Sequence, residues 1–429
     1  MRIKIISAIF MIWASAAVQA AEPLALEQVL QQARDKNPDI LAARQGWKAS
    51  QNRISPASAW PDPTFTYIDE QFPSGRPDVD PQKVQHYRVE QTIPFPGKLS
   101  RDSQMKRHEA RIAETAYRDK TLEILSDVRM RYYQLFLTDQ KILLASQAVE
   151  VMKAALNSAQ ARLGSNQTSA SDVFMAQTEL RRMENELYQQ QQQRSLIAIE
   201  LNTLLAQPTE TKLGTAQAPE LADLPVPLSD FQHLAQDNAP MYLTALHEKD
   251  HSQAMLRRNR LQFAPDFGVM FERETSPGGP AGRQIGASVS FPLWITRPWN
   301  QYQEAKEHLL ETEANSQAMQ NHVLNKVHSE VIEYNTHLTL ARNYQSTLIP
   351  LSLSNLKITR QRYAAGDADF LRLLEAFRTW ITAHNEYQQE LYSVGQHASL
   401  LGQWVGVDIG FVKQALEQQK HSQSGGHHD

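Results

Sequence analysis

The stretch ILLASQAVEVMKAALNSAQARL, residues 142–163, decides the fold because its apolar residues recur every seven positions. The same line extends toward the N-terminus and comprises Val128, Leu135, Ile142, Val149, Leu156 and Leu163. An adjacent line comprises Ala145, Met152 and Ala159. A strict seven-residue period is typical of a helix that supercoils left-handedly around a partner. We therefore predict a helix over 99–163, roughly 100 Å long, which is longer than a globular core of this size needs.

The partner helix is predicted directly after a short turn. Residues 169–207 carry apolar side chains at the same spacing, namely Val173, Leu180, Leu187 and Leu201. Residues 299–363 and 369–405 repeat the pair, and the last helix carries Leu373, Trp380, Tyr387, Val394 and Leu401. Such stripes indicate core packing and not a cofactor site. Because proline removes a helical hydrogen bond, we expect Pro350 to kink the helix over 299–363.

The chain contains two copies of one pattern, offset by about 200 residues. Residues 33–38 match 235–240, and Phe95-Pro96 matches Phe291-Pro292. We predict a mainly α fold with duplicated helix–strand–strand–helix–helix halves. The first structural repeat spans 21–225, the second spans 226–408, and a C-terminal tail spans 409–429. Before its long helices, each repeat is expected to have one helix and two strands. In the first repeat the helix spans 24–58 and the strands span 63–72 and 85–95. In the second repeat the helix spans 228–262 and the strands span 265–274 and 283–292.

The predicted strands alternate apolar and polar residues. In HYRVEQTI, residues 86–93, Tyr87, Val89 and Ile93 share one face. Both a small soluble sheet capping a helical body and an outer-membrane barrel have this pattern. Four strands cannot close a barrel, and open sheet edges are not tolerated in lipid, so several copies would have to share their strands. Two copies give eight strands and a filled interior, whereas three give twelve, so we expect a trimeric 12-stranded transmembrane β-barrel.

The N-terminus has the features of a secretory signal peptide over 1–20. Arg2 and Lys4 are followed by the apolar run 5–17, and Val18-Gln19-Ala20 has small residues at the positions that a signal peptidase reads. The apolar run is too short to span a bilayer. We therefore expect an exported chain without a transmembrane helix.

Composition excludes several functional classes. The chain has 43 Lys+Arg against 47 Asp+Glu, a net charge of −4, which argues against nucleic-acid binding through a basic field. Cysteine is absent, which excludes disulfides and thiolate chemistry. No zinc-protease, phosphate-loop or hydrolase motif is present, so we expect neither an enzyme nor a cofactor. The tail contains weak metal-ligand candidates, which a solvated tail would equally explain, at His421, His427 and His428.

The export signal, the duplicated halves and the turn Arg362-Tyr363-Ala364-Ala365-Gly366 resemble the TolC-like outer membrane factor family, from Leu24 to about Gly406. The resemblance implies a homotrimer in the outer membrane of a Gram-negative bacterium. A β-barrel in lipid would continue as a long α-helical coiled-coil barrel in the periplasm. It also implies two partners, a periplasmic adaptor (membrane fusion) protein and an inner-membrane pump of the resistance–nodulation–division type. The function implied is that of a passive exit duct in a tripartite efflux system.

One segment resembles a particular branch of this family. Pro61-Asp62-Pro63 and the run 91–99, QTIPFPGKL, are similar to the heavy-metal (cation) efflux branch of the family. From its residues alone, this segment is predicted to be a strand-to-helix turn. Pro94 and Pro96 end the strand pairing, and Gly97 allows the backbone to turn. Pro292 is the equivalent residue in the second half. The alternatives are a multidrug or type I secretion duct of the same family, a soluble periplasmic coiled-coil adaptor or scaffold, and an outer-membrane enzyme.

The resemblance also assigns roles to the two helical turns. The adaptor would contact the hairpin tips, whose candidate residues are Arg162, Gly164, Asn166, Arg362, Gly366, Asp367 and Asp369. Glycine and asparagine supply positive φ, and aspartate caps the next helix, so plain turn chemistry explains the same residue types. A periplasmic constriction is expected at Asp172, Arg372 and Glu375. Arg372 departs from the carboxylate expected there and would instead pair with a neighbour in a closed state.

Overall fold

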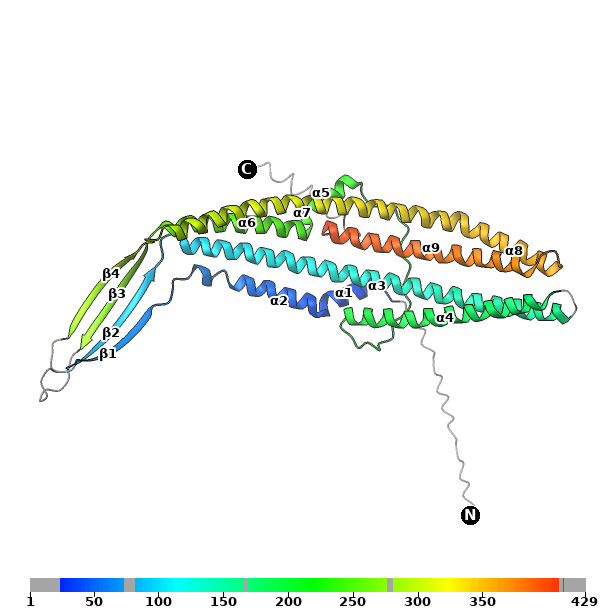
Figure 1. The fold of residues 1–429 in the computed structure, drawn as a ribbon, viewed down its shortest axis with the longest axis horizontal. Coiled ribbons are helices and arrows are strands. Elements are labelled where there is room, and N and C mark those ends of the chain that lie inside the picture. The colour runs from blue at the N-terminus through cyan, green and yellow to red at the C-terminus, as the bar shows by residue number, and fades with distance from the viewer. Residues whose placement is uncertain (1–23, 73–81, 165–167, 276–280, 409–411, 413–429) are drawn as a thin grey trace, which may run out of the picture.

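The protein is a long rod with a sheet at one end and two helical turns at the other (Figure 1). The computed structural model describes residues 24–72, 82–164, 168–275, 281–408 and 412. The signal peptide predicted over 1–20 and residue Asn166 lie outside these ranges, as does nearly all of the 409–429 tail, with His421, His427 and His428.

The first half begins with two helices, so the single helix predicted over 24–58 is wrong. Helix α1 (Leu26–Lys36) ends at Asn37, whose ψ of 125° is extended, and α2 (Pro38–Asn52) follows at once. A residue before proline is biased away from the helical region, which explains the break. The Asn37 side chain then accepts hydrogen bonds from the N–H groups of Asp39 and Ile40 and so caps α2.

The second half repeats this arrangement. Helix α5 (Leu228–Asn238) ends at Ala239, and α6 (Pro240–Arg260) begins at the next proline, so the single helix predicted over 228–262 is also wrong. Short 3₁₀ turns at Pro56–Ser58 and Leu261–Phe263 lead from each helix pair to the sheet.

The two long helical segments differ. Helix α3 (Lys98–Gly164) runs for 67 residues without a break. Its counterpart is divided into α7 (Thr296–Asn343), a π-helical turn at Tyr344–Leu348, and α8 (Ile349–Ala365). The single helix predicted over 299–363 is therefore interrupted, and the interruption lies directly before Pro350, whose missing N–H the wider π turn accommodates.

The return helices lie beside the long ones. Along α3, α2 covers the part nearest the sheet and α4 (Ala170–Leu204) the part nearest the turns (Figure 1). In the second half α6 and α9 (Phe370–Val405) cover α7 and α8 in the same order, and α3 also packs on α6 and α9. The heptad side chains Val128 and Leu135 are fully buried in this packing, whereas Leu163, near the end of α3, is 37% exposed.

The sheet joins the two halves. Strands β1 (Thr64–Phe72), β2 (Gln82–Ile93), β3 (Asp266–Thr275) and β4 (Gly282–Ser290) are antiparallel and lie in the order β1-β2-β3-β4. The hairpins β1–β2 and β3–β4 each come from one half, and β2 pairs with β3 between the halves. Strands β1 and β4 are therefore the edges of the sheet as described.

Candidate functional site

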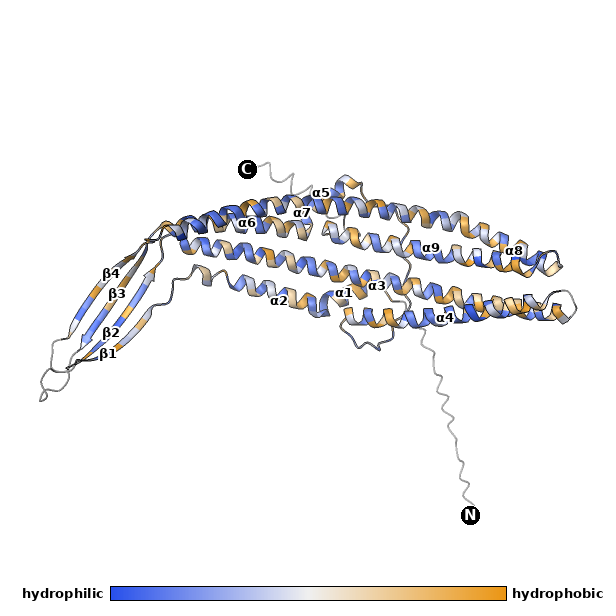
Figure 2. Ribbon diagram, in the orientation of Figure 1, coloured by the Kyte–Doolittle hydropathy of each residue, from blue (hydrophilic) through white to orange (hydrophobic). Residues whose placement is uncertain are grey.

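One face of the sheet carries a contiguous group of exposed apolar side chains. The register places Phe65, Val89, Phe271 and Ile285 in one row across all four strands. Colouring by hydropathy shows apolar and polar positions alternating along the strands (Figure 2). The apolar side chains, 37% to 86% exposed, are Phe65, Tyr67, Tyr87, Val89, Phe267, Val269, Phe271, Ile285 and Val289. A contiguous apolar face of this kind marks contact with a partner or a membrane.

The opposite face of the sheet is polar and internally paired. The carboxylate of Glu272 is only 7% exposed and lies 2.8 Å from Nη2 of Arg88 and 2.7 Å from Nδ1 of His86. Both partners come from β2, the neighbouring strand from the other half. The sheet thus pairs these charged side chains within one chain, whereas the apolar side chains of the opposite face stay exposed.

Large apolar side chains also surround the junction between the sheet and the helices. Trp294 is 82% exposed, Leu293 74%, Ile295 64% and Trp299 52%. On the first-half side, Trp60 is 59% exposed. Tryptophan is enriched where apolar and aqueous media meet, because its ring is apolar and its N–H is polar.

The strand-to-helix turn is held by one carboxylate. Gly97 has a φ of +99°, and Asp266 of β3 accepts hydrogen bonds from the Phe95 N–H at 2.7 Å and from Lys98 Nζ at 2.8 Å. Pro94 and Pro96 lie in this turn, and Pro292 lies between β4 and α7. No sequence pattern assigned a role to Asp266, so its contribution to the turn was missed.

The two helical turns contact each other through Arg162. Its guanidinium lies over the Tyr363 ring, 4.7 Å from the ring centroid, and also donates to the Tyr363 carbonyl oxygen. Tyr363 itself is buried against Phe370. The end of α3 and the end of α8 are therefore joined within one chain.

The remaining tip residues shape the second turn. Gly366 has a φ of +88°, and the Asp367 N–H donates to the Arg362 carbonyl oxygen at 2.8 Å. Asp369 is the N-cap of α9 and accepts from the Arg372 N–H at 3.0 Å. Gly164 is the last residue of α3. These groups are engaged in local turn structure at the exposed end of the rod (Figure 1).

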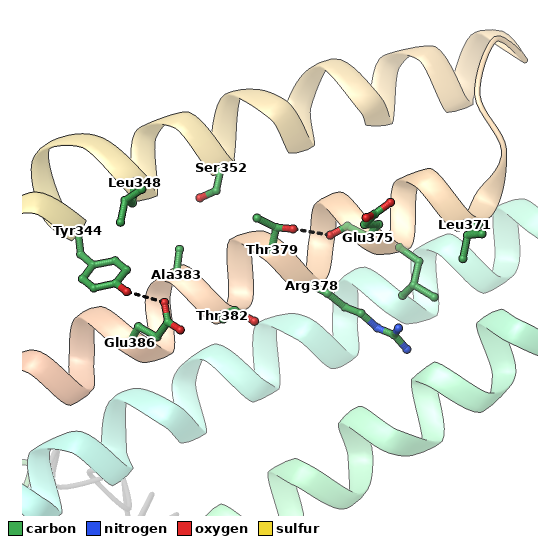
Figure 3. A pocket seen from close by; sticks show the side chains of 11 residues that line it. Tyr344, Leu348, Ser352, Leu371, Glu375, Arg378, Thr379, Thr382, Ala383 and Glu386 are labelled. Atoms are coloured by element: carbon green, nitrogen blue, oxygen red, sulfur yellow. Dashed lines mark hydrogen bonds between the residues drawn. The ribbon is translucent and has the colours of Figure 1, made fainter.

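The candidate constriction residues lie at the starts of α4 and α9. Asp172 forms a capping box with Ser169 at the start of α4. Glu375 lines a groove of about 680 Å³ between α8 and α9, where the Tyr344 hydroxyl donates to Glu386 at 2.7 Å (Figure 3). The Arg372 side chain is exposed and forms no ion pair with any residue that the structure describes, so the expected neighbour is not among the described residues.

A contact that the sequence did not reveal joins the return helices of the two halves. Glu179 of α4 is 3% exposed, and Arg378 of α9 binds both its carboxylate oxygens. The hydrogen bond to Glu179 raises the pKa of Arg378 above its usual value. The only sequence signal is that Glu179 directly precedes Leu180 of the apolar line.

Among the described residues, no helix is both long enough and apolar enough to span a membrane.

Comparison with known proteins finds one matching family model and several solved structures with the same fold. Residues 29–207 match the family model described as outer membrane efflux protein. The structure is similar to CusC (TM-score 0.80, 14% identity, covering 90% of this chain and 93% of that one). The CmeC outer membrane channel of Campylobacter jejuni gives a TM-score of 0.80 at 14% identity, with 97% of each chain covered. The outer membrane protein VceC of Vibrio cholerae gives 0.77 at 15% identity, with 90% of this chain and 96% of that one covered. No curated protein matches.

Proposed function

We propose that the chain belongs to the outer membrane efflux protein family, whose model matches residues 29–207, and that three copies form a passive exit duct through the outer membrane. The family comprises channels and not enzymes. The observation that carries the proposal is the four-stranded sheet, whose apolar side chains are exposed from Phe65 to Ile285 while Glu272 on the opposite face is paired with His86 and Arg88.

The edges of the sheet argue for the trimer. Strands β1 and β4 each have one strand neighbour in the part of the chain that the structure describes. In hydrocarbon an unpaired strand edge costs several kcal/mol per unsatisfied backbone group, so β1 of one copy would pair with β4 of the next. Three copies would give a closed barrel of twelve strands with the apolar face in lipid and the face of Glu272 toward water.

The junction residues orient this assembly. Trp294 and Trp299 lie where the sheet meets the helices and would sit at the membrane surface. The helical rod would then extend into the periplasm, since α3, with 67 residues, is roughly 100 Å long. The turns around Arg162 and Gly366 lie at the far end of the rod and would contact a periplasmic adaptor bound to an inner-membrane pump (Figure 1).

Heavy-metal cations are the proposed cargo. The support is the similarity of 61–63 and 91–99 to the cation-exporting branch of the family. In the structure these two segments also touch, since Gln91 Nε2 donates to the Pro61 carbonyl oxygen at 2.8 Å.

Biochemical and genetic experiments test the proposal. Extraction should require detergent, the purified protein should be a trimer by light scattering, and it should conduct ions in a planar bilayer. A freely soluble monomer would instead support an adaptor or scaffold. The cargo is tested by comparing metal and drug sensitivity of a deletion strain: metal sensitivity alone supports the cation branch, and drug sensitivity alone supports a multidrug duct.

A further inference from the structure

A cluster of histidine and glutamate side chains lies between α7 and α9, away from the turns and the sheet. Glu333, His337 and His397 each offer one ligand atom, and these atoms lie within 4.8 Å of one another. Glu333 and His337 are four residues apart and so share one face of α7. His397 comes from the antiparallel helix α9. Within the described part of the chain, only this group has such an arrangement.

Two further carboxylates hold the imidazole rings. Glu390 of α9 lies 2.5 Å from Nδ1 of His337, and Glu330 of α7 lies 2.7 Å from Nδ1 of His397. The pairing is reciprocal, because each helix supplies one histidine and one carboxylate to it. When a carboxylate accepts the Nδ1 proton of a neutral imidazole, the lone pair stays on Nε2. In that tautomer, Nε2 of each ring is available to bind a cation.

The rings are also fixed relative to each other. Their centroids are 5.1 Å apart and the ring planes differ by 11°. The side chains of both histidines are mostly shielded, at 23% and 18% exposed. Glu333, at 53% exposed, opens the cluster to solvent.

We propose that Glu333, His337 and His397 bind one divalent transition-metal ion such as Zn²⁺. Two imidazole nitrogens and one carboxylate oxygen, with a fourth position open to water, form a common zinc ligand set. Glu390 and Glu330 supply the carboxylate contacts that orient metal-bound histidines. In a tetrahedral zinc site the ligand atoms are about 3.3 Å apart, and His337 Nε2 already lies 3.8 Å from Glu333 Oε2. A bound ion would draw the three ligand atoms, which lie within 4.8 Å of one another, closer together.

Such an ion would join α7 to α9 beside the core formed by Tyr334, Leu338 and Val394. The sequence showed no ligand spacing of this kind, because the ligands come from two helices about 60 residues apart. The site is a resident one and does not depend on the nature of the exported cargo.

The test uses the full chain in detergent with the tail substitutions His421→Ala, His427→Ala and His428→Ala, which remove the other histidine cluster. Competition with a chromophoric chelator should give one Zn²⁺ site per chain. His337→Gln with His397→Gln should weaken binding more than 100-fold, and Glu390→Gln or Glu330→Gln about 10–100-fold. Cobalt bound in place of zinc should give the intense visible bands of a tetrahedral site.

A matched control is His308→Gln, because His308 pairs with Glu311 on the exposed surface of α7; it should leave Zn²⁺ affinity unchanged. If the double histidine variant fails to fold, as judged by circular dichroism, Glu333→Gln replaces it, since Glu333 is exposed and should still weaken binding at least tenfold. No measurable Zn²⁺ binding, or unchanged affinity in these folded variants, would overturn the proposal.

Discussion

Arg378 of α9 binds Glu179 of α4 through both Nε and Nη2, at 3.1 and 2.5 Å from the two carboxylate oxygens. The carboxylate is buried, whereas the guanidinium is 47% exposed. The pair lies beside the hydrophobic cluster that includes Ala176, Leu374 and Phe377. This ion pair therefore links α4 of the first half to α9 of the second half, close to the turns.

Arg378→Gln should destabilise the protein by about 1–3 kcal/mol, because it leaves a buried carboxylate without its charged partner. The matched control is Arg181→Gln, which removes an 80% exposed arginine paired with Glu184 on its own helix and should cost less than about 0.5 kcal/mol. Thermal unfolding in detergent measures both variants. Equal losses in the two variants would show that burial of Glu179 is not important.

The exposed charges at the start of α9 should govern ion passage. Arg372→Ala should raise single-channel conductance and cation preference in a planar bilayer, because it removes an exposed positive charge. Glu375→Gln should lower cation preference, so the two variants serve as controls for each other. Identical reversal potentials for both variants and the unchanged protein would contradict a constriction at these residues.

The elements that the sequence predicted well are those that a local pattern specifies. The seven-residue period correctly placed Val128 and Leu135 in the core. The missing hydrogen bond of proline also predicted a kink near Pro350. The π turn before Pro350 was not predicted, because it depends on how α7 and α8 pack. The helix break at Asn37 was not predicted, because the apolar pattern continues across it. The restriction that Pro38 places on the backbone of Asn37 would have indicated the break.

Contacts between distant segments could not be predicted. The pair Glu179–Arg378 and the cluster of His337 with His397 depend on the relative register of antiparallel helices. A shift of one residue along α9 would turn each partner by about 100° around the helix axis. A single sequence without its packing does not specify that register.

A charge on the apolar face of the sheet should prevent insertion into lipid. Val89→Arg should cost about 2–4 kcal/mol if Val89 faces the bilayer midplane. Thr92→Arg, on the opposite face of the same strand, should leave insertion intact and change conductance instead. The measurement is the amount of trimer recovered from the outer-membrane fraction. Similar recovery of both variants would argue that Val89 does not face lipid.

Gly406 should tolerate no side chain. Its φ is +80°, and a Cβ there would lie 2.2 Å from the carbonyl oxygen of Asn238. Gly406→Ala should therefore destabilise the protein by about 2–4 kcal/mol, combining backbone strain with a clash against backbone that cannot rotate away.

The control for this substitution is Gly46→Ala in α2, where an added Cβ meets nothing within 4 Å. Alanine in a helix interior is more favourable than glycine, so this variant should be stabilised by about 0.5–1 kcal/mol. Unfolding midpoints that move in the same direction in both variants would contradict the account of Gly406.

Acidification should destabilise the helical rod through His384. Burial lowers the pKa of His384 below the usual 6.5, and its ring packs edge-on against Trp380, 4.9 Å between centroids. The unfolded chain then binds more protons than the native chain, so stability is lost as the pH falls below about 6.5. His384→Gln should reduce the fall in Tm between pH 7.5 and 5.5, whereas His308→Gln should not. An unchanged fall in the His384 variant would show that other groups cause it.

The two long helical segments of the duplication differ in length. The offset between equivalent residues grows from 196 at Phe95 and Phe291 to 200 at Arg162 and Arg362, so the second long segment contains about one extra helical turn. In a trimer, six helical tips would then form a ring of two alternating kinds. A docking protein would meet two distinct grooves around that ring, and identical changes at Arg162 and Arg362 would have different effects on its attachment.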